Sequence, residues 1–115
     1  MADIHIGQHL AHAPNDADDL AWPARAVRDL IEDLASPEIE QGIATERFNM
    51  RGVTHKVAFE GGEQERVLAE QVRSWAKESA HWPRVAKLLH ELADLWDRHG
   101  QREDERAELD KLQSF

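Results

Sequence analysis

The sequence contains no cysteine and no tyrosine, and both absences narrow the chemistry open to it. Without cysteine, no disulfide framework, thiolate metal site or cysteine nucleophile can form. No apolar run approaches the roughly 20 residues needed to cross a bilayer. The first ten residues also lack the basic segment and apolar core of a signal peptide. We therefore expect a cytoplasmic protein that does not associate with membranes.

Basic residues are also scarce, with 14 Lys and Arg against 23 Asp and Glu and a net charge of −9. Affinity for nucleic acid depends on neutralising phosphates with cationic side chains. This balance argues against a nucleic-acid partner and favours another protein, or a second copy of the chain, as the partner. The length of 115 residues suits one domain.

Helical signals dominate the rest of the chain. Proline or glycine marks several helix starts, and apolar residues at helical spacing follow each of them. These signals predict helices over 22–35, 37–48 and 63–80, and a fourth that starts at Pro83. Residues 49–60 instead alternate apolar and polar residues, which is typical of a strand. The fold class predicted is therefore all-α: a small four-helix domain with one short extended segment or hairpin between helices 2 and 3.

The two ends of the chain differ from this helical middle. Residues 1–21 contain Gly7 and a turn signal after Pro14, so we expect a flexible N-terminal tail. Residues 22–100 form the predicted helical domain, and Gly100 is expected to interrupt its last helix. Residues 101–115 are highly charged and predict a C-terminal helical arm that projects from the domain.

The polar stretch over 51–66 is the candidate binding site, because the helical pattern breaks there and two glycines lead into a charged helix. Its candidate binding residues are Arg51, Lys56, Glu60, Gly61, Gly62, Gln64, Glu65 and Arg66. A glycine-rich turn before a helix can bind an anion, but the surrounding glutamates would repel a phosphate. A structural interpretation competes with the site: the glycines form a sharp turn, and Arg51 or Arg66 pairs with an acid elsewhere in the fold.

Two groups of histidines raise the alternative of a metal-binding protein or hydrolase. His5, His9 and His12 recur at i, i+4 and i+7, which places imidazoles, common zinc ligands, on one side of a helix. His90 and Asp94 partly match the H-E-x-x-H pattern of zinc hydrolases, with aspartate replacing the second histidine. The first group lies in the predicted tail and has a glycine inside it, and the second has no evident third ligand, so we predict no metal, no cofactor and no catalytic residue.

Two further alternatives concern DNA. An acidic DNA mimic would array carboxylates like phosphates, and the candidates are Asp16, Asp18, Asp19, Asp29, Glu32 and Asp33. A helix-turn-helix would use the helix restart at Trp82-Pro83 to present Arg84 and Lys87, but the net charge opposes it. The function we expect is therefore a non-enzymatic protein-interaction module, a regulator, adaptor or inhibitor, that acts through an acidic, polar surface.

Overall fold

The computed structural model describes residues 2–50 and 62–113 and confirms an all-α fold. Its helices are α1 (Ala2–Leu10), α2 (Arg25–Leu34), α3 (Pro37–Asn49), α4 (Glu63–Glu78) and α5 (Pro83–Gln113). No strand occurs within these two described ranges. Most of the predicted extended segment, from residue 51 onward, lies outside them.

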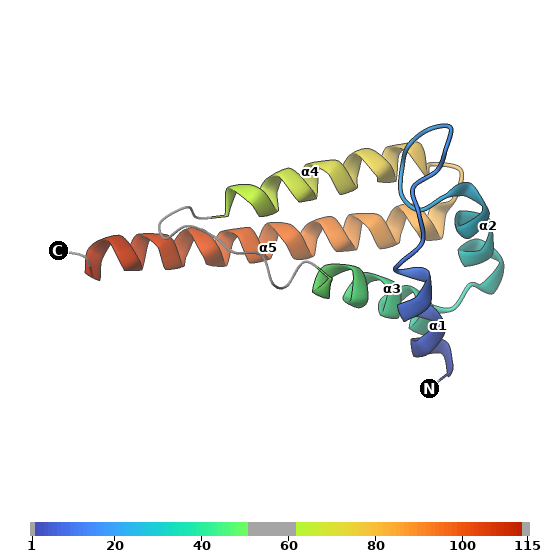
Figure 1. The fold of residues 1–115 in the computed structure, drawn as a ribbon, viewed down its shortest axis with the longest axis horizontal. Coiled ribbons are helices and arrows are strands. Elements are labelled where there is room, and N and C mark those ends of the chain that lie inside the picture. Colours follow the sequence, from blue (N-terminus) through green and yellow to red (C-terminus); the bar gives the residue numbers. More distant parts are fainter. Residues whose placement is uncertain (1, 51–61, 114–115) are drawn as a thin grey trace.

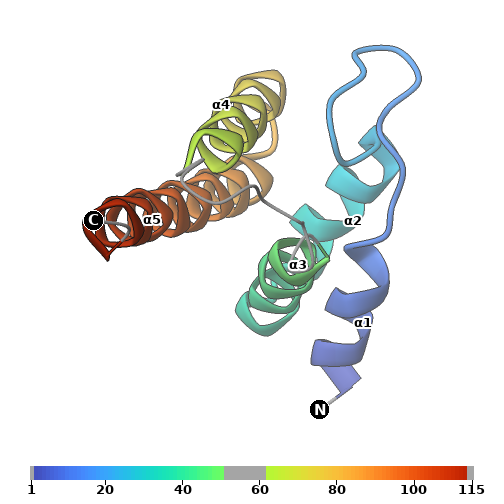
Figure 2. The same ribbon diagram turned by 60° about the vertical axis from the view of Figure 1, so that its left-hand side comes forward.

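The 31-residue helix α5 is the axis of the molecule and, at 1.5 Å per residue, is about 46 Å long. α4 lies along it as an antiparallel hairpin, while α2 and α3 contact α5 and α1 packs on α3 (Figure 1). Seen from the side, the α4–α5 hairpin and the α1–α3 pair form two layers (Figure 2). The result is an elongated molecule with extents of 55 × 32 × 19 Å.

Local sequence signals set most of the helix starts. The Ser36 hydroxyl accepts a hydrogen bond from the Ile39 N–H, and Pro37 is the first residue of α3, as the sequence predicts. Pro83 likewise begins α5. Pro23 differs: it follows a cis peptide bond, and α2 begins only at Arg25. The two Trp-Pro pairs therefore occupy different structural positions.

The core lies where the two layers meet along α5. Its largest fully buried side chains include Trp22, Ile31, Ile43, Leu89 and Leu92. Phe48 of α3 contacts Trp96 of α5 with ring centroids 4.5 Å apart, and His99 meets the Phe48 ring edge-on at 5.6 Å. The inner face of α5 is thus fully used by the fold.

Residues 2–10, part of the predicted flexible tail, form a helix packed against α3. The contact depends on two glycines: a Cβ atom on Gly7 would lie 2.6 Å from the Ile39 carbonyl oxygen and 3.0 Å from the Gly42 Cα. The backbones of α1 and α3 therefore approach more closely than side chains at these positions would permit. Glycine, which weakens an isolated helix, here allows two helices to pack.

The following segment, residues 11–24, is tied to the domain by its own polar groups. The Asp16 carboxylate accepts hydrogen bonds from the backbone N–H groups of Asp18, Asp19 and Arg25. Trp22 is buried, and its indole N–H donates to the Ala13 carbonyl at 2.7 Å. Through these contacts the segment covers one end of the core.

Helix α5 continues through Gly100 without interruption, contrary to the expected break there. Its C-terminal part extends past the first residue of α4 and projects from the rest of the molecule (Figure 1). The predicted arm is therefore a direct extension of the longest helix. The division of the chain into tail, domain and arm otherwise stays a prediction.

Candidate functional site

The Gly-Gly turn is attached to the C-terminal part of α5. The Gly62 N–H donates to one carboxylate oxygen of Asp104 at 2.7 Å, and the Arg66 guanidinium pairs with the other. A Cβ atom on Gly62 would lie 2.0 Å from the Gly100 carbonyl oxygen, so only glycine fits against α5 here. Asp104 thus caps the N-terminus of α4, where a negative charge is favourable.

Of the predicted binding residues, Gly62, Gln64, Glu65 and Arg66 lie in the described part of the chain. Glu65 is only 5% exposed, and one of its oxygens lies 3.9 Å from the His99 imidazole. Arg66 has the intramolecular acidic partner that the structural interpretation predicts. Arg51, Lys56, Glu60 and Gly61 lie outside the described residues. A binding role for this stretch stays a prediction, and its described half anchors α4 to α5.

The histidines considered as metal ligands are dispersed. His5 and His9 are exposed on α1, whereas His12 lies beyond the end of α1 and 3.8 Å from Glu46. His90 is exposed, and Asp94 accepts a hydrogen bond from Arg73. Within residues 2–50 and 62–113, no group of three or more histidines and carboxylates is placed to hold a metal ion.

Several acids proposed as a DNA mimic instead bind groups of the fold itself. Asp29 accepts a hydrogen bond from the Trp82 indole at 2.8 Å. Glu32 accepts from the backbone N–H groups of Arg84 and Val85 and so caps the N-terminus of α5 from α2. The Arg84 side chain pairs with Glu40 at 2.6 Å, so it does not point freely from a recognition helix.

Asp19 is the most tightly engaged of these carboxylates. It forms a two-pronged pair with Arg28, whose side chain is fully buried, with both nitrogen–oxygen distances at 2.9 Å. The Arg28 hydrogen bond, together with the Ala21 N–H, lowers the pKa of Asp19 to about 2. The Arg25 N–H likewise lowers the pKa of Asp16. These acids hold α2 and the segment before it in place.

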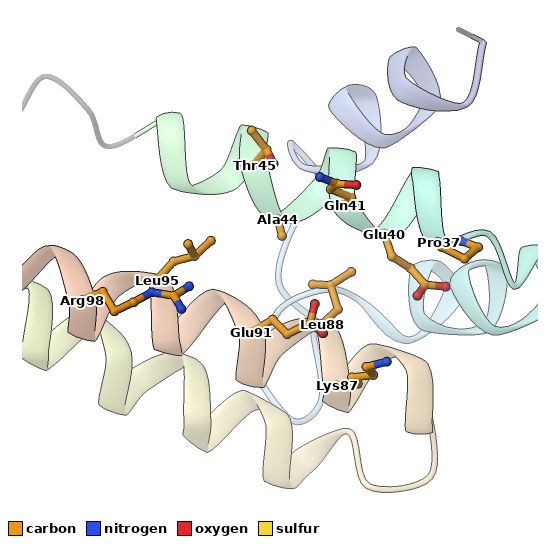
Figure 3. Close-up of a pocket in the computed structure, with 10 residues that line it drawn as sticks. All are labelled: Pro37, Glu40, Gln41, Ala44, Thr45, Lys87, Leu88, Glu91, Leu95 and Arg98. Carbon is orange, nitrogen blue, oxygen red and sulfur yellow. The ribbon is translucent and has the colours of Figure 1, made fainter.

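A groove of about 460 Å³ separates α3 from α5 on the side away from α4 (Figure 3). Gln41, Ala44 and Thr45 line it from α3, and Glu91, Leu95 and Arg98 from α5. The groove is open, and it mixes charged, polar and apolar side chains.

An uncovered face of α5 begins at this groove and follows the helix to its C-terminal end. Its residues recur at alternating spacings of three and four, and we call them the outer seam: Leu95, Arg98, Arg102, Glu105, Leu109 and Leu112. Such spacing places side chains on one face of a helix and is the pattern of coiled-coil contacts. All of these side chains are exposed except Leu95, which is half-buried. Leu109 and Leu112 are 57% and 70% exposed.

Within the described part of the chain, no ion pair involves Arg98, Arg102 or Arg106. In contrast, Arg25, Arg28, Arg66, Arg73 and Arg84 all pair with carboxylates. Like charges at i, i+4 destabilise a helix by about 0.2–0.5 kcal/mol per pair. Arg102 forms two such pairs, with Arg98 and with Arg106, and Glu105 at i+3 is the one carboxylate three or four residues from it.

The outer seam is absent from the sequence-based site because Gly100 is expected to end the helix. A break at that position separates Leu95 and Arg98 from Arg102, Glu105 and the leucines, so the shared face is lost. The sequence does contain the pattern: the seam residues recur at spacings of three and four over 18 residues. The pattern can be recognised once 83–113 is treated as one helix.

Comparison of the chain with family models, curated proteins and solved structures found no match. In the part of the chain that the structure describes, no helix is both long enough and apolar enough to span a membrane.

Proposed function

We propose that the protein is a non-enzymatic interaction module that binds a helix of a partner protein along the outer seam of α5. The observation that carries the proposal is a projecting helix face with two exposed leucines and with two arginines that have no acidic partner among the described residues. Exposed apolar residues at coiled-coil spacing favour contact with another helix. Unpaired arginines favour a partner that carries carboxylates.

This proposal moves the binding surface away from the acidic one expected from composition. Asp16, Asp19, Asp29, Glu32 and Asp104 already bind donors within the molecule. Using them for a partner would require breaking contacts that position α2, α4 and α5. The outer seam needs no such rearrangement, and its leucines favour a protein partner over nucleic acid, whose phosphates would engage only the arginines.

Affinity capture tests the proposal with two matched charge reversals. Arg102→Glu reverses a charge in the outer seam, and Lys77→Glu reverses an exposed lysine at the end of α4. Wild-type, Arg102→Glu and Lys77→Glu proteins are each immobilised and exposed to a lysate of the source organism, with and without nuclease treatment. The retained proteins are identified by mass spectrometry. We expect partners that wild type and Lys77→Glu retain and Arg102→Glu loses.

Identical sets of proteins on all three variants would contradict a binding role for the outer seam. Retention that disappears only on nuclease treatment would assign the arginines to phosphates and replace the protein partner with a nucleic acid.

A further inference from the structure

We propose that the helix bound by the outer seam is α5 of a second copy of this chain, in antiparallel orientation; this inference rests on the proposed function. In this arrangement two chains form a two-fold dimer, in which each contact occurs twice. The order of residue types along the seam is what selects a second copy as the partner.

The outer seam is complementary to its own reverse. When two copies lie antiparallel with Arg102 opposite the partner's Glu105, Glu105 lies opposite the partner's Arg102 by symmetry. The same register places Leu95 opposite the partner's Leu112, and Arg98 opposite the partner's Leu109. Two ion pairs therefore occupy the middle of the seam, and leucine contacts occupy both ends.

A parallel arrangement has the opposite electrostatics. In register, it places Arg102 against the partner's Arg102 and Glu105 against the partner's Glu105, so every charged position of the seam meets its like. Like charges held close together across an interface cost free energy and select against that orientation. The charge order therefore specifies the antiparallel dimer.

The α3–α5 groove gives the end of the partner's helix a place to pack. Leu95 lies both in the groove and in the outer seam, beside Ala44 and Thr45 of α3 (Figure 3). The antiparallel register brings the partner's Leu112 to Leu95. The most exposed large apolar side chain of the described chain would thus be covered at the rim of an existing groove.

The contact is short, because Leu95 and Leu112 are 17 residues apart, or about 26 Å along the helix. Coiled coils of fewer than three heptads are marginal, and charged residues in a seam weaken it while fixing its register. We therefore expect a reversible dimer that dissociates on dilution.

Sedimentation velocity over a range of protein concentrations tests the dimer and its register together. Arg102→Glu places glutamate against glutamate at both central pairs, and Glu105→Arg places arginine against arginine. We expect each single variant to weaken dimerisation at least tenfold. The double variant Arg102→Glu/Glu105→Arg recreates both pairs with the charges exchanged, and we expect it to restore the dimer. Lys77→Glu is the control and leaves dimerisation unchanged.

Cysteine cross-linking tests the orientation independently, since the chain has no cysteine of its own. Leu95→Cys and Leu112→Cys proteins are mixed under mild oxidation. Antiparallel pairing yields the mixed disulfide between the two variants, whereas parallel pairing would yield disulfides between identical variants. Circular dichroism of every variant verifies that the helices are retained.

A monomeric wild type at all concentrations would overturn the dimer. So would a dimer that Arg102→Glu leaves intact, or one that the double variant fails to restore. If the wild type is monomeric but captures another protein through Arg102, the proposed function stands and only the self-pairing fails. A monomer whose captured proteins are insensitive to Arg102→Glu would overturn both.

Discussion

At the scale of single residues, the fold depends on acids that each hold a specific donor. Asp19 and the buried Arg28 are the clearest case, because the guanidinium also donates to the carbonyl of Pro23 at 2.6 Å and lies 5.0 Å from the center of the Trp82 ring. An unpaired charge at a buried position is strongly unfavourable. The carboxylate of Asp19 is therefore required for Arg28 to remain buried between α2 and the start of α5.

We expect Asp19→Asn to lower the free energy of unfolding by about 3 kcal/mol, because it leaves a buried arginine without its counter-charge. Urea denaturation at neutral pH measures this change. Asp18→Asn is the control: Asp18 is 80% exposed and pairs only with Arg25, so we expect a loss of no more than about 0.5 kcal/mol. Equal losses in the two variants would contradict the role given to Asp19.

The same pair predicts a pH dependence of stability. The pKa of Asp19 is lowered from 3.8 to about 2 in the folded protein, so the unfolded state takes up a proton first as pH falls. The stabilisation is complete above about pH 5 and is lost as the pH falls through 3.8 towards 2. Thermal denaturation should show a smaller loss of stability over this range in Asp19→Asn than in the wild type. Parallel profiles would contradict the assignment.

At the scale of helices, glycine marks the places where two backbones meet. Gly7 and Gly42 lie at the α1–α3 contact, and Gly62 and Gly100 at the start of the α4–α5 contact. From sequence, Gly7, Gly42 and Gly100 indicate a weak or broken helix, because glycine lowers helix propensity, and Gly62 indicates a turn. In the structure each lies against another backbone, so its missing side chain permits the packing.

Gly7→Ala separates these two interpretations, because they predict opposite signs. Helix propensity alone predicts that alanine stabilises α1 by about 1 kcal/mol. The new Cβ atom would lie 2.6 Å from the Ile39 carbonyl oxygen, and such overpacking costs about 1–3 kcal/mol. We expect a net loss of stability in chemical denaturation. A more stable variant would show that α1 does not pack on α3 as the structure has it.

The helices could be predicted because their signals are local. Ser36-Pro37 and Trp82-Pro83 mark starts that the structure confirms, and apolar spacing shows that α5 is amphipathic. The packing of α1 and the continuity of α5 through Gly100 could not be predicted, since both depend on contacts with residues far away in the sequence. The same holds for the candidate site. The sequence suggests that Arg66 pairs with an acid, but it does not identify Asp104 as that acid.

At the scale of the whole molecule, charge is divided between two tasks. The net charge of −9 suggests an acidic binding surface, yet many of the acids that could form one hold helix ends and loops together. Within the described residues, Arg98, Arg102 and Arg106 of α5 instead have no acidic partner. Net charge thus describes the solubility of this chain better than it describes where the chain binds.

This division implies that the exposed charged residues of the outer seam contribute nothing to folding, whereas Leu95 also packs against the core. Arg102 lies four residues from both Arg98 and Arg106, so it takes part in two repulsive pairs on α5. Replacing it by glutamate turns both pairs into attractive ones, and turns only the attractive pair with Glu105 at i+3 into a repulsive one. The substitution that we expect to abolish binding should therefore stabilise the isolated chain.

The most direct test is the free energy of unfolding of Arg102→Glu against wild type, measured by urea denaturation at a concentration where both are monomeric. We predict that Arg102→Glu is more stable by about 0.5 kcal/mol, because the two repulsive pairs with Arg98 and Arg106 become attractive while the single attractive pair with Glu105 at i+3 becomes repulsive. A loss of about 1 kcal/mol or more would show that Arg102 supports the fold, and would contradict the assignment of this face to binding.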